Sequence, residues 1–539
     1  MKKLILLIVL LLAAPCWSAT YYVDATDGND SKTGLSAELA WKTIAKINSF
    51  ATTTNFSAGD QILLQRGETW TGDSTLCDGA DWDVLDGLTI GAYGEGDKPF
   101  LDGDSQRPMN FDNDTGGTLS NLTIENIDIS GQDWQAGKAS NLWIRDISGI
   151  TLDGITGDGN YTGNTSDGKN AINLWTCSGT IIIKNCELEN WGPSTIPSVT
   201  EDFVGITLYT MTTGSYTIYD NTIGYINADC IQISSCTAPG LIYGNTLYNG
   251  GEESLDIKNS SNCEIYQNDF YRTVDFTGEG GSGGTKVLAE AYNGANVTFR
   301  DNTFHDGDAS GVTIQTVENG NIYRNKFDGL AGNIKIADHV SNSNISYNII
   351  TNPDAIGTGG REGCIFENNS ESGNTIYNNT IYLGTGNATS GIYLASNINT
   401  TIKNNLVSWE GASNWCFYAG TAGDPAVVEN NCWYNPSNSN KVYYEGSAYG
   451  SGNWTTWVAS HSGEIYSDPL LTDPSNDVFT LKPGSPCINA GVNLGSDYDD
   501  ALNPDSTWPD GVLTIDQDIW KTWEIGAYVW PYGGGYKIW

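Results

Sequence analysis

Apolar and polar residues alternate in short runs that recur through the middle of the chain, and most of these runs end in asparagine. Examples are Ile-Tyr-Asp-Asn, Ile-Tyr-Gly-Asn, Ile-Tyr-Gln-Asn and Ile-Tyr-Arg-Asn. Alternation with a period of two places every second side chain on the same face of an extended strand, so the runs predict strands with one buried face. The closing asparagines are Asn185, Asn221, Asn245, Asn268, Asn302, Asn325, Asn348, Asn379, Asn405 and Asn431.

The spacing of these asparagines predicts how the strands are arranged. Successive gaps are 36, 24, 23, 34, 23, 23, 31, 26 and 26 residues. A strand-and-turn unit with a period in the low twenties is typical of a solenoid, and the leucine spacing of leucine-rich repeats is absent. We therefore predict an all-β fold, a right-handed parallel β-helix (solenoid) with one coil per repeat.

Stacking of such coils has two further consequences. Each asparagine is expected to occupy a turn, because asparagine tolerates left-handed backbone geometry, and the stacked side chains can hydrogen-bond as a ladder. The three longest gaps predict normal coils with insertions, and insertions in solenoids usually fall on one binding face.

The two ends of the chain lack the repeat. Residues 41–50 carry apolar residues at helical spacing and predict a short N-terminal helix that covers the open end of the solenoid. We assign residues 20–84 to this N-terminal cap with its entry strands, residues 85–440 to the parallel β-helix and its catalytic domain, and residues 441–539 to a C-terminal cap. Five tryptophans of the last segment could bind sugar, although sealing the solenoid end is favoured: Trp508, Trp520, Trp523, Trp530 and Trp539.

The first residues predict export. Two lysines follow Met1, residues 4–14 are apolar, and Ser18-Ala19 provides a small-residue exit, as in a secretory signal peptide over residues 1–19. The apolar run is too short to span a bilayer. We expect a secreted chain, extracellular or periplasmic, in which disulfides are permitted. The remaining cysteines either form the pairs Cys177/Cys186, Cys230/Cys236 and Cys416/Cys432 or pack as buried thiols.

Charge narrows the possible partners. Asp and Glu number 64 against 25 Lys and Arg, giving a net charge of −39. This excess argues against nucleic acid and against anionic membranes as partners. The acidic residues serve either solubility or calcium binding. We expect a monomer whose partner is a polysaccharide.

The outward positions of the predicted strands form two columns on one exposed face, with neighbouring coils about 4.8 Å apart. The first column is predicted to contain Asn173, Thr207, Gln232, Asp256, Glu290, Gln315, Lys335 and Tyr393. The second column is predicted to contain Trp175, Tyr209, Ser234, Lys258, Tyr292, Val317, Ala337 and Ala395.

A chemically dense patch is expected in the middle of these columns. Asp256, Lys258, Glu290 and Tyr292 would form a two-by-two cluster of candidate catalytic residues. Flat rings of Trp175 and Tyr209 could stack against sugars. The complete set of candidate substrate-binding residues is Trp175, Tyr209, Gln232, Arg272, Gln315 and Lys335.

Residues 249–262 read Asn-Gly-Gly-Glu-Glu-Ser-Leu-Asp-Ile-Lys-Asn-Ser-Ser-Asn. This segment resembles the central motif of polysaccharide lyase family 6, which includes alginate lyases and chondroitinase B. The resemblance implies that Lys258 is the catalytic base and that Glu253 serves calcium. The family's second calcium glutamate falls on Gly251, with Glu252 beside it. The family's Arg-His-Gly is absent, and Tyr292 stands in the arginine column.

The resulting hypothesis is β-elimination on a uronate-containing polysaccharide such as alginate or pectate. Calcium held by Glu253 with Glu252, Asp229 or Asp256 would bind the substrate carboxylate and acidify the adjacent C–H. Lys258 would take that proton, and Tyr292 would protonate the leaving oxygen.

Two alternatives remain open on the sequence. A glycoside hydrolase could use Asp256 with Glu290, or Asp229 with Asp256, as its carboxylate pair. A non-catalytic polysaccharide-binding protein would use the same face without cleaving its ligand.

Overall fold

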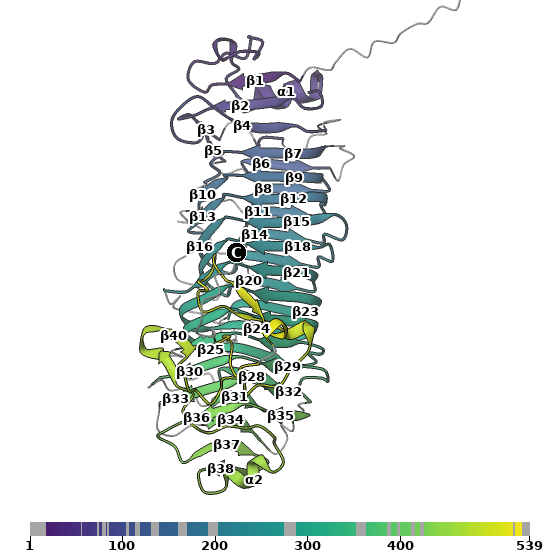
Figure 1. Cartoon of the computed structure of the whole chain (residues 1–539). Helices are drawn as coiled ribbons and strands as arrows, with labels where there is room; N and C mark the ends of the chain where they lie inside the picture. The colour runs from purple at the N-terminus through teal and green to yellow at the C-terminus, as the bar shows by residue number, and fades with distance from the viewer. Residues whose placement is uncertain are drawn as a thin grey trace, which may run out of the picture.

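Parallel pairing between strands one coil apart builds a right-handed β-helix, seen in Figure 1 as a long stack of coils. The computed structural model describes residues 18–54, 56–72, 75–77, 82, 86–103, 107–113, 119–130, 140–159, 170–191, 203–273, 287–351, 363–384, 390–395, 399–410, 415–420, 425–520 and 523–530. The predicted fold class is confirmed. The expected signal peptide lies outside the described residues except for its last two positions.

Each coil contributes strands to three faces. The first face carries the two predicted columns, and its register is continuous from β6 to β37. Its separate strands are β6 (Met109–Asp112), β8 (Ser140–Arg145), β11 (Asn170–Trp175), β14 (Val204–Tyr209), β17 (Ile231–Ser234), β20 (Glu253–Lys258), β28 (Ile365–Asn368), β31 (Ser390–Leu394), β34 (Trp415–Ala419) and β37 (Asn440–Tyr444).

The second face follows the first in each coil, and the stack begins here with β1. Its strands are β1 (Thr20–Val23), β2 (Gln61–Gln65), β4 (Thr89–Tyr93), β7 (Ser120–Glu125), β9 (Ser148–Asp153), β12 (Ser178–Lys184), β15 (Ser215–Tyr219), β18 (Gly240–Tyr243), β21 (Ser261–Tyr266), β26 (Asn344–Ser346), β29 (Thr375–Tyr377), β32 (Thr401–Lys403) and β35 (Val427–Glu429). Parallel pairing therefore starts nearer the N-terminus than residue 85.

The third face closes each coil. Its strands are β3 (Thr69–Thr71), β5 (Phe100–Asp102), β10 (Thr156–Asp158), β13 (Glu187–Glu189), β16 (Thr222–Ile226), β19 (Thr246–Gly250), β22 (Asp269–Tyr271), β27 (Ile349–Thr351), β30 (Thr380–Leu383), β33 (Leu406–Trp409) and β36 (Cys432–Tyr434). Three long strands bend from one face to the next: β23 (Val287–Arg300), β24 (Thr303–Tyr323) and β25 (Lys326–Ala337).

The interior is a column of apolar side chains supplied by every second strand residue. Leu255 and Ile257 of β20 are almost fully buried, as the alternation requires. Phe270, Phe304 and Phe327 stack in successive coils with ring centroids 4.7 and 4.8 Å apart. Such stacking in register ties the coils together along the axis.

Nine of the ten asparagines form the predicted ladder between the second and third faces. Each side chain from Asn221 to Asn405 donates to the carboxamide oxygen of the next asparagine, and Asn431 ends the ladder by donating to Glu464. Asn185 is an exception: it is exposed, and Cys186 takes the ladder position by donating its N–H to Asn221.

The left-handed backbone geometry lies one residue earlier than predicted. In the ladder coils, positive φ values belong to the residue before the asparagine, such as Gln267 (φ 55), Asp301 (φ 58) and Arg324 (φ 56). The ladder asparagine itself turns inward, where its amide satisfies backbone carbonyls that the turn would leave unpaired.

The N-terminal end is covered by α1 (Ile44–Thr53), close to the predicted helix. Thr43 caps it by accepting the backbone N–H of Lys46 at 3.0 Å. Trp41 is not helical; it lies buried beside β1 and forms a bridge with Val23. A short 3-10 turn, η1 (Ala37–Leu39), precedes it.

The C-terminal end is covered by β38 (Ser447–Gly450), which pairs antiparallel with β37, and by α2 (Trp454–Val458). The chain then returns along the outside of the solenoid, shown in yellow-green to yellow in Figure 1. Trp508 of this returning segment donates to the Arg324 carbonyl at 2.8 Å, so it lies on the flank and does not seal the end. The elements of the returning segment are β39 (Leu471–Asp473), η2 (Pro474–Asn476), β40 (Val478–Leu481), η3 (Ser496–Tyr498), β41 (Asp500–Leu502), β42 (Thr514–Asp516) and α3 (Gln517–Trp520).

Ten cysteines lie within the described residues, from Cys77 to Cys487, and all are buried free thiols. They pack as small apolar residues, which is the second of the two sequence interpretations. No helix of the described chain combines the length and apolarity needed to cross a bilayer.

Candidate functional site

The two-by-two cluster predicted on the first face is present. Asp256 of β20 pairs in register with Gln232 of β17 on one side and with Glu290 of β23 on the other. Lys258 pairs with Tyr292 of β23 in the same way. The four candidate catalytic side chains therefore leave the same face from adjacent coils, about 4.8 Å apart along the solenoid axis.

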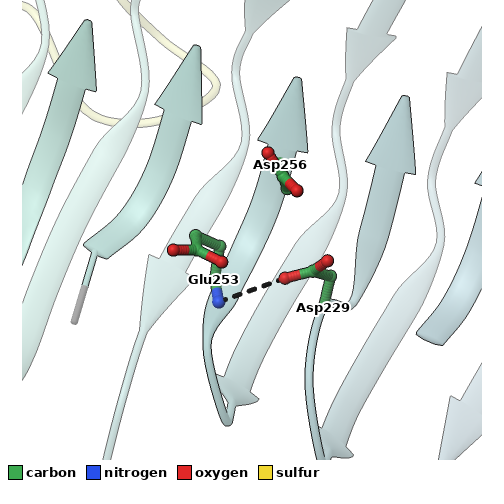
Figure 2. A group of neighbouring side chains, drawn as sticks. All are labelled: Asp229, Glu253 and Asp256. Carbon is green, nitrogen blue, oxygen red and sulfur yellow. Dashed lines mark hydrogen bonds between the residues drawn. The ribbon is translucent and has the colours of Figure 1, made fainter. Parts of the chain in front are cut away.

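Three carboxyl groups converge beside Lys258. Carboxylate oxygens of Asp229, Glu253 and Asp256 all lie within 4.8 Å of one another, and Figure 2 shows the three side chains gathered at the start of β20. We call these three residues the carboxylate cluster. Asp229 and Asp256 are fully buried, and Glu253 is half-buried.

Local backbone geometry holds this cluster together. Glu253 donates its backbone N–H to Asp229 Oδ1 at 3.2 Å, the dashed contact in Figure 2. Gln232 Nε2 donates to Asp229 Oδ2 at 3.0 Å and reaches Asp256 Oδ2 at 3.5 Å. The single amide of Gln232 thus joins two carboxylates from neighbouring coils.

Lys258 supplies the compensating charge. Its Nζ lies 2.5 Å from Asp256 Oδ2, while the side chain remains 38% exposed on the first face. Burial alone lowers the pKa of the Lys258 ammonium, but the charges of Asp256 and Asp229 raise it by more, so the net shift is upward. In this state Lys258 is protonated at neutral pH.

Burial and nearby acidic groups raise the pKa values of the neighbouring carboxyl groups, whereas a salt bridge would lower them. Burial, and then the charges of Asp256 and Glu253, raise the pKa of Asp229 well above its usual value. Burial, Asp256 and Glu290 raise the pKa of Glu253 to about 8. Burial and Asp256 also raise the pKa of Glu290. At neutral pH the cluster therefore holds protons that a cation could replace.

The residues of the cluster fit a hard divalent cation. Carboxylate oxygens are the preferred ligands of calcium, and three carboxyl groups meet here. Once ionised, they carry more negative charge than Lys258 can neutralise. Of the predicted metal ligands, Glu253 and Asp229 belong to the cluster. Glu252 is exposed and stands next to it. Asp256, which was predicted as a catalytic residue and as an alternative calcium ligand, is the third member of the cluster.

An aromatic platform lies on earlier coils of the first face. The rings of Trp175 and Tyr209 have centroids 4.1 Å apart, and Trp175 is 37% exposed. Trp143 of β8, which the sequence interpretation missed, stacks 5.9 Å from Trp175. Its coil has no ladder asparagine to anchor the count, although the alternation in Ser-Asn-Leu-Trp-Ile-Arg carried the signal.

One predicted column was misaligned beyond Glu290. Thr313, not Gln315, follows Glu290 in the first column, and Lys335 comes next. Gln315 belongs to the second column below Tyr292, where Val317 had been predicted; Val317 is fully buried. A shift of two residues keeps a side chain on the same face of a strand, so alternation could not reveal this error.

Arg272 does not line the exposed face as predicted. Its side chain is only 4% exposed, and its Nη1 donates to the Gly251 carbonyl at 3.2 Å. Arg272 therefore supports the connection that leads from β19 to the carboxylate cluster. It is a positioning residue for Glu252 and Glu253 and is not available to bind sugar at the surface.

Comparison with known proteins agrees with the fold. The model of the family described as "Right handed beta helix region" matches residues 204–381, which include the carboxylate cluster. A lacto-N-biosidase of Bifidobacterium longum subsp. longum is 23% identical over 163 residues, which are 30% of this chain. The match spans only 9% of the length of that curated relative.

Similar solved structures include a lacto-N-biosidase and a pectate lyase. A GH136 lacto-N-biosidase from Eubacterium ramulus is 14% identical, with a TM-score of 0.44 over 79% of this chain and 67% of that chain. The pectate lyase Pel9A is 12% identical, with a TM-score of 0.29 over 95% of this chain and 97% of that chain.

Proposed function

We propose that the chain is a secreted carbohydrate-active enzyme, and specifically a polysaccharide lyase that cleaves a uronate-containing polysaccharide on the first face. The observation that carries this proposal is the placement of Lys258, an exposed ammonium 2.5 Å from Asp256 at the edge of three converging carboxyl groups. A base for proton abstraction and a cation site for the substrate carboxylate are thereby adjacent.

The cation site follows from the carboxylate cluster. Asp229, Glu253 and Asp256 would hold calcium, with Glu252 beside them. Calcium bound there would neutralise the cluster and attract the carboxylate of a uronate, making the neighbouring C–H more acidic. The charges of Asp256 and Asp229 raise the pKa of Lys258, and burial lowers it. When calcium neutralises the two carboxylates, the effect of burial remains and the pKa of Lys258 falls. Lys258 would then be a better base.

The remaining residues have defined tasks. Lys258 Nζ would accept the proton from the carbon next to the uronate carboxyl group. Tyr292, 41% exposed on the next coil, would donate its phenolic proton to the leaving glycosidic oxygen. Trp175 and Tyr209 would bind sugar units on the earlier coils, and Gln232, Gln315 and Lys335 line the same face and would bind others.

Ultraviolet absorbance of the unsaturated product tests the reaction. The mature chain is incubated with alginate, pectate, chondroitin and other uronic polysaccharides, each with calcium and with chelator. We expect a calcium-dependent rise on one substrate and its loss in Lys258→Ala. Lys184→Ala, which removes a lysine paired with Asp153 on the second face, is the matched control and should retain activity. Full activity in Lys258→Ala would refute the assignment of the base.

A hydrolase is the second candidate because of the shifted carboxyl groups. Burial and Asp256 raise the pKa of Glu290, whereas the ammonium of Lys258 lies beside Asp256. Two carboxyl groups on adjacent coils in such different environments suit the acid and the base that glycoside hydrolysis needs. The similar lacto-N-biosidases agree with this candidate. It predicts reducing ends without unsaturated sugar, formed equally well in chelator and lost in Glu290→Gln.

Export and binding complete the proposal. Cleavage of residues 1–19 would place the enzyme outside the cytoplasm with its substrate. The intact mass of the secreted chain would then correspond to a chain that begins at Thr20. Binding of a polysaccharide without any product, unchanged in Lys258→Ala and Asp256→Asn, would favour the non-catalytic alternative.

A further inference from the structure

A cavity lies away from the carboxylate cluster, where the returning C-terminal segment crosses the third face. Its volume is about 360 Å³, within the range of small-molecule sites. Thr303, Lys326 and Ile349 supply its floor from successive coils. Residues 477–480, 504 and 506–508, together with Tyr528, supply its walls.

The lining combines aromatic surface with opposite charges. Trp508 and Tyr528 present rings, and the Trp508 indole is fixed by its 2.8 Å hydrogen bond to the Arg324 carbonyl. Lys326 Nζ lies 3.5 Å from Asp477 Oδ2, a distance longer than a direct hydrogen bond. Both ends of this pair are therefore able to take part in a further polar contact.

The charged pair and the rings define what the cavity can bind. A ligand here needs an anionic group for Lys326, a hydrogen-bond donor for Asp477 and an apolar face for the rings.

We propose that this cavity is a second sugar-binding site that holds one hexuronate unit of an acidic oligosaccharide. The carboxylate would pair with Lys326, hydroxyls would donate to Asp477, and the C–H face of the sugar would lie against Trp508 or Tyr528. The choice of an acidic sugar rests on the function proposed above.

The two sites are separate, and β25 runs from the cavity to the first face. Lys326 and Lys335 stand near opposite ends of β25, with Lys335 in the first column of the first face. Nine residues of extended chain separate them, which sets a limit of roughly 30 Å on their distance. A chain held in the cavity therefore stays close to the first face, which raises its effective concentration there.

Calorimetric titration of the full mature chain tests this site without turnover. Trimers of galacturonate and of mannuronate are titrated into Lys258→Ala, and cellotriose is the neutral probe. We expect one acidic trimer to bind at the cavity, and Lys326→Met in the same background to weaken that binding about tenfold, as loss of a charge-assisted hydrogen bond implies. Trp508→Ala should weaken it as well. Lys482→Met, an exposed lysine outside the cavity, should leave it unchanged.

Thermal unfolding of each variant shows whether the fold is intact, and Asp477→Asn replaces Lys326→Met if that variant unfolds. Unchanged affinity in Lys326→Met and Trp508→Ala, or equal binding of cellotriose, would overturn the proposal. The outcome is independent of the cleavage assay. Cavity binding without any cleavage would overturn the lyase alone, whereas cleavage with unchanged trimer affinity in both cavity variants would overturn the second site alone.

Discussion

The carboxylate cluster should make the metal-free protein less stable as the pH rises. Burial first, and then the charges of Asp256 and Glu290, raise the pKa of Glu253 from 4.5 to about 8 in the folded protein. The folded state therefore holds this proton more tightly than the unfolded state does. Its contribution to stability is fully present below about pH 4.5 and is lost as the pH rises to about 8.

The magnitude follows from the size of the shift. The difference between 8 and 4.5 is 3.5 pKa units for Glu253, and at 1.36 kcal/mol for each unit the free energy of unfolding falls by on the order of 5 kcal/mol across this window. Asp229 adds a contribution of the same sign, because its pKa is also raised by burial. Calcium should reverse the loss at pH 8 by binding the ionised cluster in the folded state only.

Urea unfolding followed by tryptophan fluorescence at pH 5, 6, 7 and 8, in chelator, measures the effect. The net charge of −39 also weakens the fold as carboxyl groups ionise, so the informative quantity is the difference between wild type and Glu253→Gln. Glutamine keeps the shape but cannot ionise, and its variant should show a much flatter pH dependence. Glu187→Gln, at an exposed position of β13, is the matched control and should follow the wild type. Equal pH dependence in Glu253→Gln and wild type would refute the reasoning.

Three further outcomes follow from the same structure. Calcium binding should release protons near pH 7, because the raised pKa values of Asp229 and Glu253 favour bound protons in the metal-free state. Titration calorimetry in buffers of different ionisation enthalpy measures this release. The same titrations should show that Asp256→Asn weakens calcium binding at least tenfold. Asn325→Ala should lower the free energy of unfolding by roughly 2–5 kcal/mol. The substitution removes the buried oxygen that accepts the backbone N–H and side-chain amide of Asn302, and the amide that donates to the Phe299 and Tyr323 carbonyls. Urea unfolding checks this against Asn293→Ala on the exposed surface.

The fold was predictable because the same strand-and-turn sequence pattern recurs from coil to coil. Apolar alternation gave the strands, and the asparagine spacing gave the coil length, which together placed Asp256, Lys258, Glu290 and Tyr292 in one patch. The prediction was less accurate where this sequence pattern changes. Cys186 replaces an asparagine in the ladder, so counting from Asn185 was offset by one residue, although Asn173 and Trp175 still fell in their columns.

The carboxylate cluster itself was only half visible in the sequence. Asp229 precedes β17 and Glu253 opens β20, and side chains at such connections are directed by local turns, not by the period of the strand. The burial of Arg272 depends in the same way on a contact across the connection, to the Gly251 carbonyl. Alternation could not give these directions, and only the coordinates bring Asp229 within hydrogen-bonding distance of the Glu253 backbone.

The solenoid does not need buried charge at this point. Positions equivalent to Asp256 in the first column carry Asn173 and Thr207 on earlier coils and Thr313 on a later one, all neutral and all largely buried. Each of those coils packs well with an uncharged side chain, so burial of Asp256 next to a buried Asp229 lowers stability where a neutral residue would serve. Local rules broken without benefit to the fold are expected at functional sites. The same reasoning makes a direct test possible: Asp256→Thr, which copies the neighbouring coils, should stabilise the metal-free protein at pH 8 and abolish both calcium binding and cleavage.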